Sequence, residues 1–291
     1  MNKKKYLNNS KSCSMRQETN YCVRNFFTIL MVLFFSNVIL AQDIKLSEKE
    51  LETALDSILK EGNLLYKYEK SAWISTDLAS NTPILNNRGG YFTYEIDSKI
   101  KTIILGKNQN CIAEYIFTTD FDEPDSILLD ERDFNPIEDK LLKIREKIIK
   151  QLSDKKYNVR IPNGYSPNFI LLPFREGYKL YMIMGTSQSD VIPFGNDYLF
   201  IADKNGKIKK WQKFHSGLIF APTTYKGAEV TSHSHSHLRT TPLITATDIC
   251  TFMLYAPFTE MEEFSVYSPA LGMYMTYNLK TNEITTKKSE N

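Results

Sequence analysis

The sequence contains little cysteine. It has four cysteines in 291 residues, and two of them, Cys13 and Cys22, lie in the first 41 residues. The other two, Cys111 and Cys250, fall in what we expect to be separate structural units. Two thiols in an oxidising compartment are able to pair, but this spacing does not support a disulfide framework. Cys250 lies in an apolar stretch and is expected to be a core residue.

A large excess of charge of either sign is also missing. The first 41 residues hold six basic residues and one acidic residue, which leaves 30 basic and 33 acidic residues and a net charge of −3 in the remainder. This balance provides no electrostatic basis for binding nucleic acid. With 42% apolar and 24% charged residues, the composition excludes collagen-like, low-complexity and mostly disordered chains.

Long apolar runs are absent except at residues 26–40. This run has 15 residues, whereas a transmembrane helix needs about 20. Basic residues precede the run, and Ala41 and Gln42 follow it, as in a secretory signal peptide. We therefore expect cleavage after Ala41 and an exported chain, periplasmic or secreted, with no integral membrane segment in its mature part.

The remaining residues show no internal repeat and no linker rich in Pro, Gly or Ser. They also contain no G-x-S-x-G, C-x-x-C or H-E-x-x-H motif and no phosphate-binding glycine loop. Their pattern divides into an N-terminal α+β region, residues 42–155, and a C-terminal β-rich domain, residues 156–291. The predicted fold class is α+β, with a mostly antiparallel sheet flanked by helices.

Two helices have recognisable starting signals. Ser47 and Glu50 form a capping box before apolar residues at helical spacing, and Gly62 is expected to end or interrupt that helix. Asn135 caps the second helix, with Pro136 in its first turn. Strands are predicted between the helices at residues 90–96, 100–105 and 111–118, and the acid-rich residues 120–133 are expected to form a solvated loop.

Histidines carry the most informative pattern. His233, His235 and His237 alternate with serines on a predicted strand, so the three imidazoles share one face. Neighbours on that face are about 6–7 Å apart and can meet one cation, but the outer pair is about 13 Å apart. Two adjacent histidines are therefore the expected ligands, and the third is a bystander. His215, between two predicted strands, is a further ligand, a general acid or a partly buried structural histidine.

An acidic residue follows at a suitable distance. Thr245 is the predicted N-cap of a helix, and Asp248 lies in the first turn of that helix. Two histidines and one carboxylate leave a fourth position for water, which is the layout of a catalytic zinc site. The alternative is that the histidines form a polar strand edge and that Asp248 only interacts with the helix terminus.

This spacing resembles the JAMM motif of the MPN metalloprotease fold, H-x-H-P-x(n)-S-x-x-D. The match consists of His235, His237, Asp248 and Thr245, with Leu238 in place of the proline. The resemblance implies an MPN-like C-terminal part and a zinc-dependent peptidase that cleaves peptide or isopeptide bonds in a peptide or protein substrate. It assigns His235, His237 and Asp248 as zinc ligands, and it assigns Thr245 to a metal-bound water or an oxyanion.

The family also carries a catalytic glutamate on an upstream strand. The nearest acid at that place is Glu176, two residues from the aligned position. The leading hypothesis is therefore an exported zinc hydrolase with Glu176 as its base. The alternative is a non-catalytic exported binding or envelope-associated protein. An iron(II) oxygenase site fits less well, because its order and spacing of ligands differ.

Overall fold

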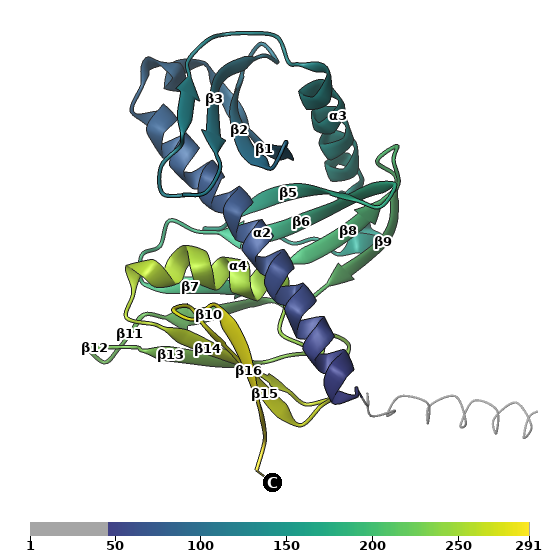
Figure 1. Cartoon of the computed structure of the whole chain (residues 1–291), viewed down its shortest axis with the longest axis vertical. Coiled ribbons are helices and arrows are strands. Elements are labelled where there is room, and N and C mark those ends of the chain that lie inside the picture. Colours follow the sequence, from purple (N-terminus) through teal and green to yellow (C-terminus); the bar gives the residue numbers. More distant parts are fainter. Residues whose placement is uncertain (1–45, 291) are drawn as a thin grey trace, which may run out of the picture. The chain divides into compact units, whose positions relative to one another are not determined.

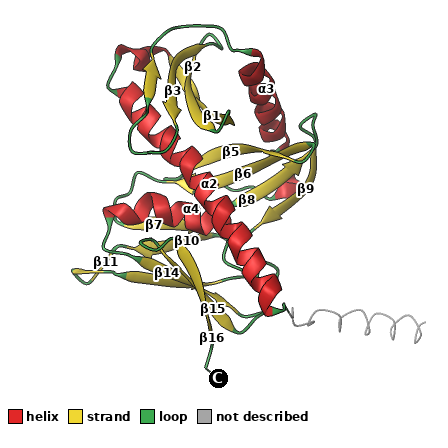
Figure 2. Cartoon of the chain, in the orientation of Figure 1, coloured by secondary structure: helices red, strands yellow, loops and turns green. Residues whose placement is uncertain are grey.

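The computed structural model describes residues 46–290. The predicted signal peptide, residues 1–41, lies outside this range. Among the described residues, no helix combines the length and the apolar character needed to cross a membrane. The secondary structure is α+β with mostly antiparallel sheets, as predicted (Figure 1 and Figure 2).

Helix α2 (Glu48–Ser80) is the longest described element. Its capping box forms as predicted, because the Glu50 amide donates to the Ser47 side chain and the Ser47 amide donates to the Glu50 carboxylate. The prediction that Gly62 ends or interrupts the helix was wrong, because α2 continues to Ser80. Gly62 lies where α2 crosses α4 (Ala246–Tyr255), and a Cβ at this position would lie 2.8 Å from Ile249 Cβ. Close helix crossing explains this glycine, although glycine inside a helix costs about 1 kcal/mol.

Antiparallel strands form the first sheet, in the order β1-β2-β3-β4. After a short helical turn, η1 (Pro83–Asn87), its strands are β1 (Arg88–Ile96), β2 (Lys99–Gly106), β3 (Cys111–Phe117) and β4 (Ser126–Leu128). The three strands predicted here are confirmed. Helix α3 (Pro136–Gln151) begins at the predicted Asn135 cap.

The middle sheet is also antiparallel, in the order β5-β6-β8-β9. After the turn η2 (Lys155–Tyr157), its strands are β5 (Ser166–Phe174), β6 (Gly177–Gly185), β8 (Tyr198–Ala202) and β9 (Ile208–Lys213). Strand β7 (Val191–Gly195) instead pairs with β10 (Leu218–Pro222). Strand β7 was missed because it is buried throughout and contains Pro193, so it lacks the alternation that marks a strand.

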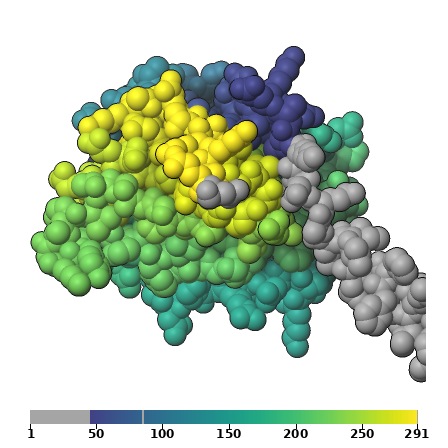
Figure 3. Space-filling model, turned by 90° about the horizontal axis from the view of Figure 1, so that it is seen from below, coloured from purple at the N-terminus to yellow at the C-terminus, as the bar shows by residue number. Residues whose placement is uncertain are grey.

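The C-terminal sheet has the order β13-β14-β15-β16. Strand β13 (Ser232–Ser236) runs parallel to β14 (Glu263–Ser268), and α4 with the turn η3 (Ala256–Phe258) connects them. Antiparallel β15 (Met273–Asn278) and β16 (Glu283–Lys288) complete the sheet. These two strands belong to the yellow part of Figure 3, which lies beside a green part. His237 was predicted on the same strand as His233 and His235, but β13 ends at Ser236. The short strand β12 (Ala228–Glu229), which precedes β13, pairs with β11 (Thr224–Tyr225).

Two hydrophobic clusters form the core. The first packs α4 against α2 and the surrounding strands, so it draws on residues on both sides of position 155. The second packs α3 against the first and middle sheets. Cys250 belongs to the first cluster and Cys111 to the second, and both are buried thiols without a disulfide partner in the described range.

Candidate metal centre

Four side chains from separate segments converge: His215, His235, His237 and Asp248. His215 lies in the connection between β9 and β10, and His235 lies within β13. His237 directly follows β13, and Asp248 lies in the first turn of α4. One ligand atom from each residue lies within 4.8 Å of all the others, so these residues can hold a metal ion.

The separations between the ligand atoms suit a four-coordinate ion. His237 Nε2 lies 2.9 Å from His215 Nε2 and 3.3 Å from His235 Nε2. Asp248 Oδ1 lies 3.4 Å from His215 Nε2 and 3.8 Å from His235 Nε2. A tetrahedral ion with bonds of about 2.0–2.1 Å places its ligand atoms about 3.3 Å apart. The four distances lie on both sides of this value.

Hydrogen bonds at the outer ring nitrogens orient two of the imidazoles. His215 Nδ1 lies 2.7 Å from Asp197 Oδ1, and His237 Nδ1 lies 2.7 Å from the carbonyl oxygen of Leu243. Both partners are acceptors, so each Nδ1 carries a proton and each Nε2 presents a lone pair to the centre. Because the two Nε2 atoms lie 2.9 Å apart, a cation or a proton between them removes the repulsion of their lone pairs.

The carboxylate of Asp248 is shared between the helix cap and the centre. Its Oδ2 accepts hydrogen bonds from the Thr245 hydroxyl at 2.6 Å and from the Thr245 amide at 3.0 Å. Its Oδ1 is buried and has no hydrogen-bond partner within residues 46–290. A buried carboxylate oxygen without a partner destabilises the fold, and a bound cation would remove that cost.

Thr245 contacts Asp248 through its hydroxyl, which donates to Asp248 Oδ2 and accepts from the Asp248 amide. Its role at a metal-bound water or an oxyanion, which the resemblance implies, stays a prediction. Thr245 Oγ1 also lies 2.9 Å from Thr247 Oγ1, and the Thr247 hydroxyl donates to Asp197 Oδ2. A continuous chain of polar contacts thus links the candidate ligand His215 to the candidate ligand Asp248.

Asp197 was not identified from the sequence. It precedes β8 and lies 18 positions before His215, so no short motif connects the two. The available sequence signal was an acidic residue at the start of a strand. This signal does not identify a site unless the partner of the acid is known. His215 was identified only as one of three alternatives, and the structure places it in the cluster.

Burial and neighbouring charges shift the pKa values of the candidate ligands in different directions. Burial opposes a charge on His215, but the carboxylates of Asp197 and Asp248 outweigh it and raise its pKa to about 9. Burial lowers the pKa of His235 to about 3, so this ring is neutral near pH 7. Burial also opposes a charge on Asp248, but His215 and His237 hold its pKa well below the usual range. Without a metal, a proton on His215 therefore takes the place of the cation.

The centre is closed to solvent. The exposed fractions of the side chains are 2% for His215, 5% for His235 and 0% for both His237 and Asp248. A catalytic zinc site keeps one position for water or substrate, whereas a structural site fills all four positions with protein ligands. The arrangement here has four candidate ligands, and none of their side chains is open to solvent.

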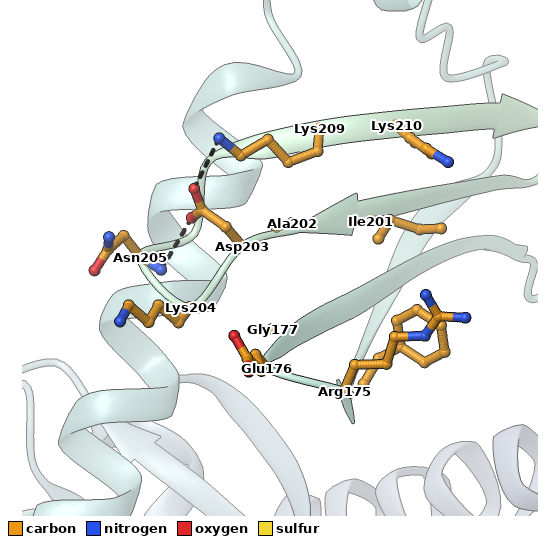
Figure 4. A pocket seen from close by; sticks show the side chains of 11 residues that line it. Arg175, Glu176, Gly177, Ile201, Ala202, Asp203, Lys204, Asn205, Lys209 and Lys210 are labelled. Atoms are coloured by element: carbon orange, nitrogen blue, oxygen red, sulfur yellow. Dashed lines mark hydrogen bonds and ion pairs between the residues drawn. The ribbon is translucent and has the colours of Figure 1, made fainter.

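Glu176 is not brought to this centre. It is exposed in the turn between β5 and β6, beside the Asp203–Lys209 ion pair (Figure 4). Tyr178 at that end of β6 pairs with Ala202, at the far end of β8 from Asp197. β8 has five residues, and the four steps from Tyr198 to Ala202 separate its two ends by about 13 Å. The assignment of Glu176 as the base for this site therefore fails on its position.

His233 lies outside the cluster, as expected for the bystander. Its ring stacks on Phe194, with the ring centroids 5.6 Å apart.

Comparisons with family models, curated proteins and solved structures find no match to this chain. The similarity to the JAMM motif therefore rests on the residues alone, and the structure adds His215 and Asp197 to them.

Proposed function

We propose that this chain binds one zinc ion through His215, His235, His237 and Asp248, and that the ion stabilises an exported, non-catalytic protein. The observation that carries the proposal is the buried set of four ligand atoms, with separations of 2.9, 3.3, 3.4 and 3.8 Å on both sides of the tetrahedral value. Export is inferred from the apolar run at residues 26–40.

The donor set favours zinc over other common cations. Ca²⁺ and Mg²⁺ prefer oxygen ligands in larger numbers, whereas zinc accepts histidine nitrogen and aspartate oxygen in a tetrahedron. Copper(II) and nickel(II) favour tetragonal sites. The hydrogen bonds that His215 and His237 donate from Nδ1 are also of the kind that fix ligating histidines.

A stabilising role follows from the origin of the ligands. They come from the β9–β10 connection, from β13 and the residue after it, and from the start of α4. The unfolded chain does not present these ligands together, so the free energy of metal binding contributes to folding. Helix α4 also packs against α2 in the first core cluster, so the ion would hold one end of a central core helix.

A zinc-dependent hydrolase of the JAMM type is the second candidate, and the spacing of its motif favours it. His235 and His237 lie at a strand end, and Asp248 lies at a helix start, in the order of that motif. Zinc bound there would polarise a peptide carbonyl and lower the pKa of a bound water. This reaction would require His215 to leave the fourth position and a base other than Glu176.

Metal analysis of the purified chain tests the first candidate. The chain is prepared without a polyhistidine tag or chelators, and its bound metals are quantified by mass spectrometry. We expect one zinc per chain in the wild type and none in His237→Ala. His233→Ala is the matched control, because it removes a neighbouring imidazole that lies outside the ligand set, and it should retain the zinc.

His215→Ala separates the two candidates. A stabilising four-ligand centre predicts weaker zinc binding, lower stability and no peptidase activity in this variant. A hydrolase predicts that the variant retains zinc, admits water and cleaves peptides. Absence of metal above the His237→Ala level would contradict both candidates.

A further inference from the structure

A groove of about 530 Å³ lies between α3 and the turn that joins β2 to β3. This volume is within the range of small-molecule sites, about 300–1,000 Å³. Half-buried apolar side chains line it and continue into the second core cluster: Leu105, Phe134, Leu142 and Ile149. None of the four candidate zinc ligands belongs to its lining.

Most charged side chains along the groove already have partners. Lys143 pairs with Asp139 at 2.7 Å, and Lys150 pairs with Glu146 at 3.0 Å, both along the surface of α3. Lys107 Nζ donates a hydrogen bond to a backbone carbonyl at 2.9 Å. These rim residues add little net charge to the groove.

Arg145 is different. Its Nε is buried and has no hydrogen-bond partner in the described part of the chain. Its guanidinium lies over the Phe92 ring, 5.8 Å from the ring centroid, and the side chain lines the groove. Among the described residues no carboxylate forms an ion pair with this guanidinium, so an anion in the groove would meet an unpaired positive charge.

Neighbouring side chains do not fully neutralise the charge of Arg145. Glu69 of α2 and Tyr91 of β1 act on Arg145 electrostatically. Burial raises the pKa of Glu69 to about 7, so its carboxyl carries only part of a charge at neutral pH. Tyr91 is a neutral phenol at this pH, because burial raises its pKa well above the usual range. Arg145 is therefore incompletely compensated.

We propose that the groove binds an amphiphilic carboxylate, with the carboxylate on Arg145 and an apolar chain along Leu105, Leu142 and Ile149. A guanidinium presents paired donors that match a carboxylate, and the apolar lining supplies the area that a hydrocarbon chain would bury. This ligand would give the non-catalytic protein a binding activity separate from its metal centre.

Isothermal titration of the purified, zinc-loaded chain with dodecanoate tests the proposal. We expect saturable binding of one dodecanoate per chain and no comparable binding of dodecyltrimethylammonium, which has the same chain length and the opposite charge. Arg145→Met should weaken dodecanoate binding about tenfold or more, because a charge-assisted pair is lost. Lys143→Met is the matched control, and its effect should stay within about twofold, because this exposed lysine is already paired.

Leu142→Trp gives a second, independent variant. It fills the apolar part of the groove and keeps Arg145, so it should also weaken dodecanoate binding while zinc content stays at the wild-type level. Three results would overturn the proposal: no saturable binding by the wild type, equal affinity in Arg145→Met, or equal binding of the cationic amphiphile. Zinc content and a melting curve measured on each sample separate these results from misfolding or loss of metal.

Discussion

Two polar clusters in this chain balance their charges in opposite ways. In the first, Arg132 bonds Glu114 at 2.5 Å and Glu138 at 2.7 and 2.8 Å, and the Tyr94 hydroxyl donates to Glu138 at 2.9 Å. In the candidate metal centre, imidazole lone pairs and a carboxylate converge, and Asp248 Oδ1 has no hydrogen-bond partner in the described range.

The difference shows how to identify a ligand site from side chains alone. A cluster that contains both cations and carboxylates pairs internally and needs nothing from outside. A cluster that consists of acceptors needs a cation, either a metal ion or a proton. Removing metal ions with a chelator should therefore destabilise only the candidate metal centre. Variants in the two clusters should respond differently to that chelator.

The largest effect is expected for His237→Ala. This variant loses an imidazole at the middle of the ligand set, and the free energy of unfolding should fall by about 4 kcal/mol at a metal concentration a thousandfold above the dissociation constant. Denaturant unfolding with and without a chelator provides the measurement. The chelator should destabilise the wild type by a similar amount and leave the variant unchanged. A variant that still responds to the chelator would contradict the assignment.

Glu138→Gln should have the next largest effect. It leaves Arg132 without one of its two carboxylates, and because this arginine is partly exposed the expected loss is about 2–3 kcal/mol. The same denaturant experiment should give equal losses with and without a chelator, and zinc content should not change. A loss that appears only in the metal-loaded protein would show that the two clusters are coupled.

Asp197→Asn sharpens the comparison at the metal centre. Asp197 orients His215 without belonging to the ligand set, so the variant should keep one zinc per chain and bind it about 10–100 times more weakly. Competition with a fluorescent zinc chelator measures this change. Unchanged affinity would mean that His215 does not depend on Asp197 for its orientation.

The smallest effect is a pH dependence of the metal-free protein. The pKa of His215 is raised to about 9, so between pH 6.5 and pH 9 the folded state holds a proton that the unfolded state has released. Stability should therefore fall as pH rises, by about 1 kcal/mol per unit between pH 7 and pH 8. Unfolding of the metal-free wild type beside His215→Gln isolates this contribution. Equal slopes in both proteins would contradict the assigned proton.

Local signals predicted much of the fold. The caps at Ser47 and Asn135 and the strands between the two helices depend on residues within a few positions of each other, and all of them formed. The prediction for Gly62 was wrong because its reason lies in α4, which packs there from far along the chain. Strand β7 is buried on both faces and has no periodic pattern to reveal it.

In the candidate site, too, the residues at short sequence spacing were predicted and the distant ones were not. His235, His237 and Asp248 have a short, recognisable spacing, and the structure brings them together. The pairing of β8 and β9 and the connections at their ends bring His215 and Asp197 to the site. No short sequence motif therefore predicts these two residues. These two residues change the interpretation, because His215 is a candidate for the fourth position, which was expected to hold water, and Asp197 bonds to its ring.

X-ray absorption spectroscopy at the zinc edge of the metal-loaded chain tests the central claim most directly. The account predicts four nitrogen or oxygen ligands at about 2.0–2.1 Å, three of them imidazoles and none of them an exchangeable water. A spectrum with two imidazoles and a water, or a chain that does not take up zinc, would contradict it.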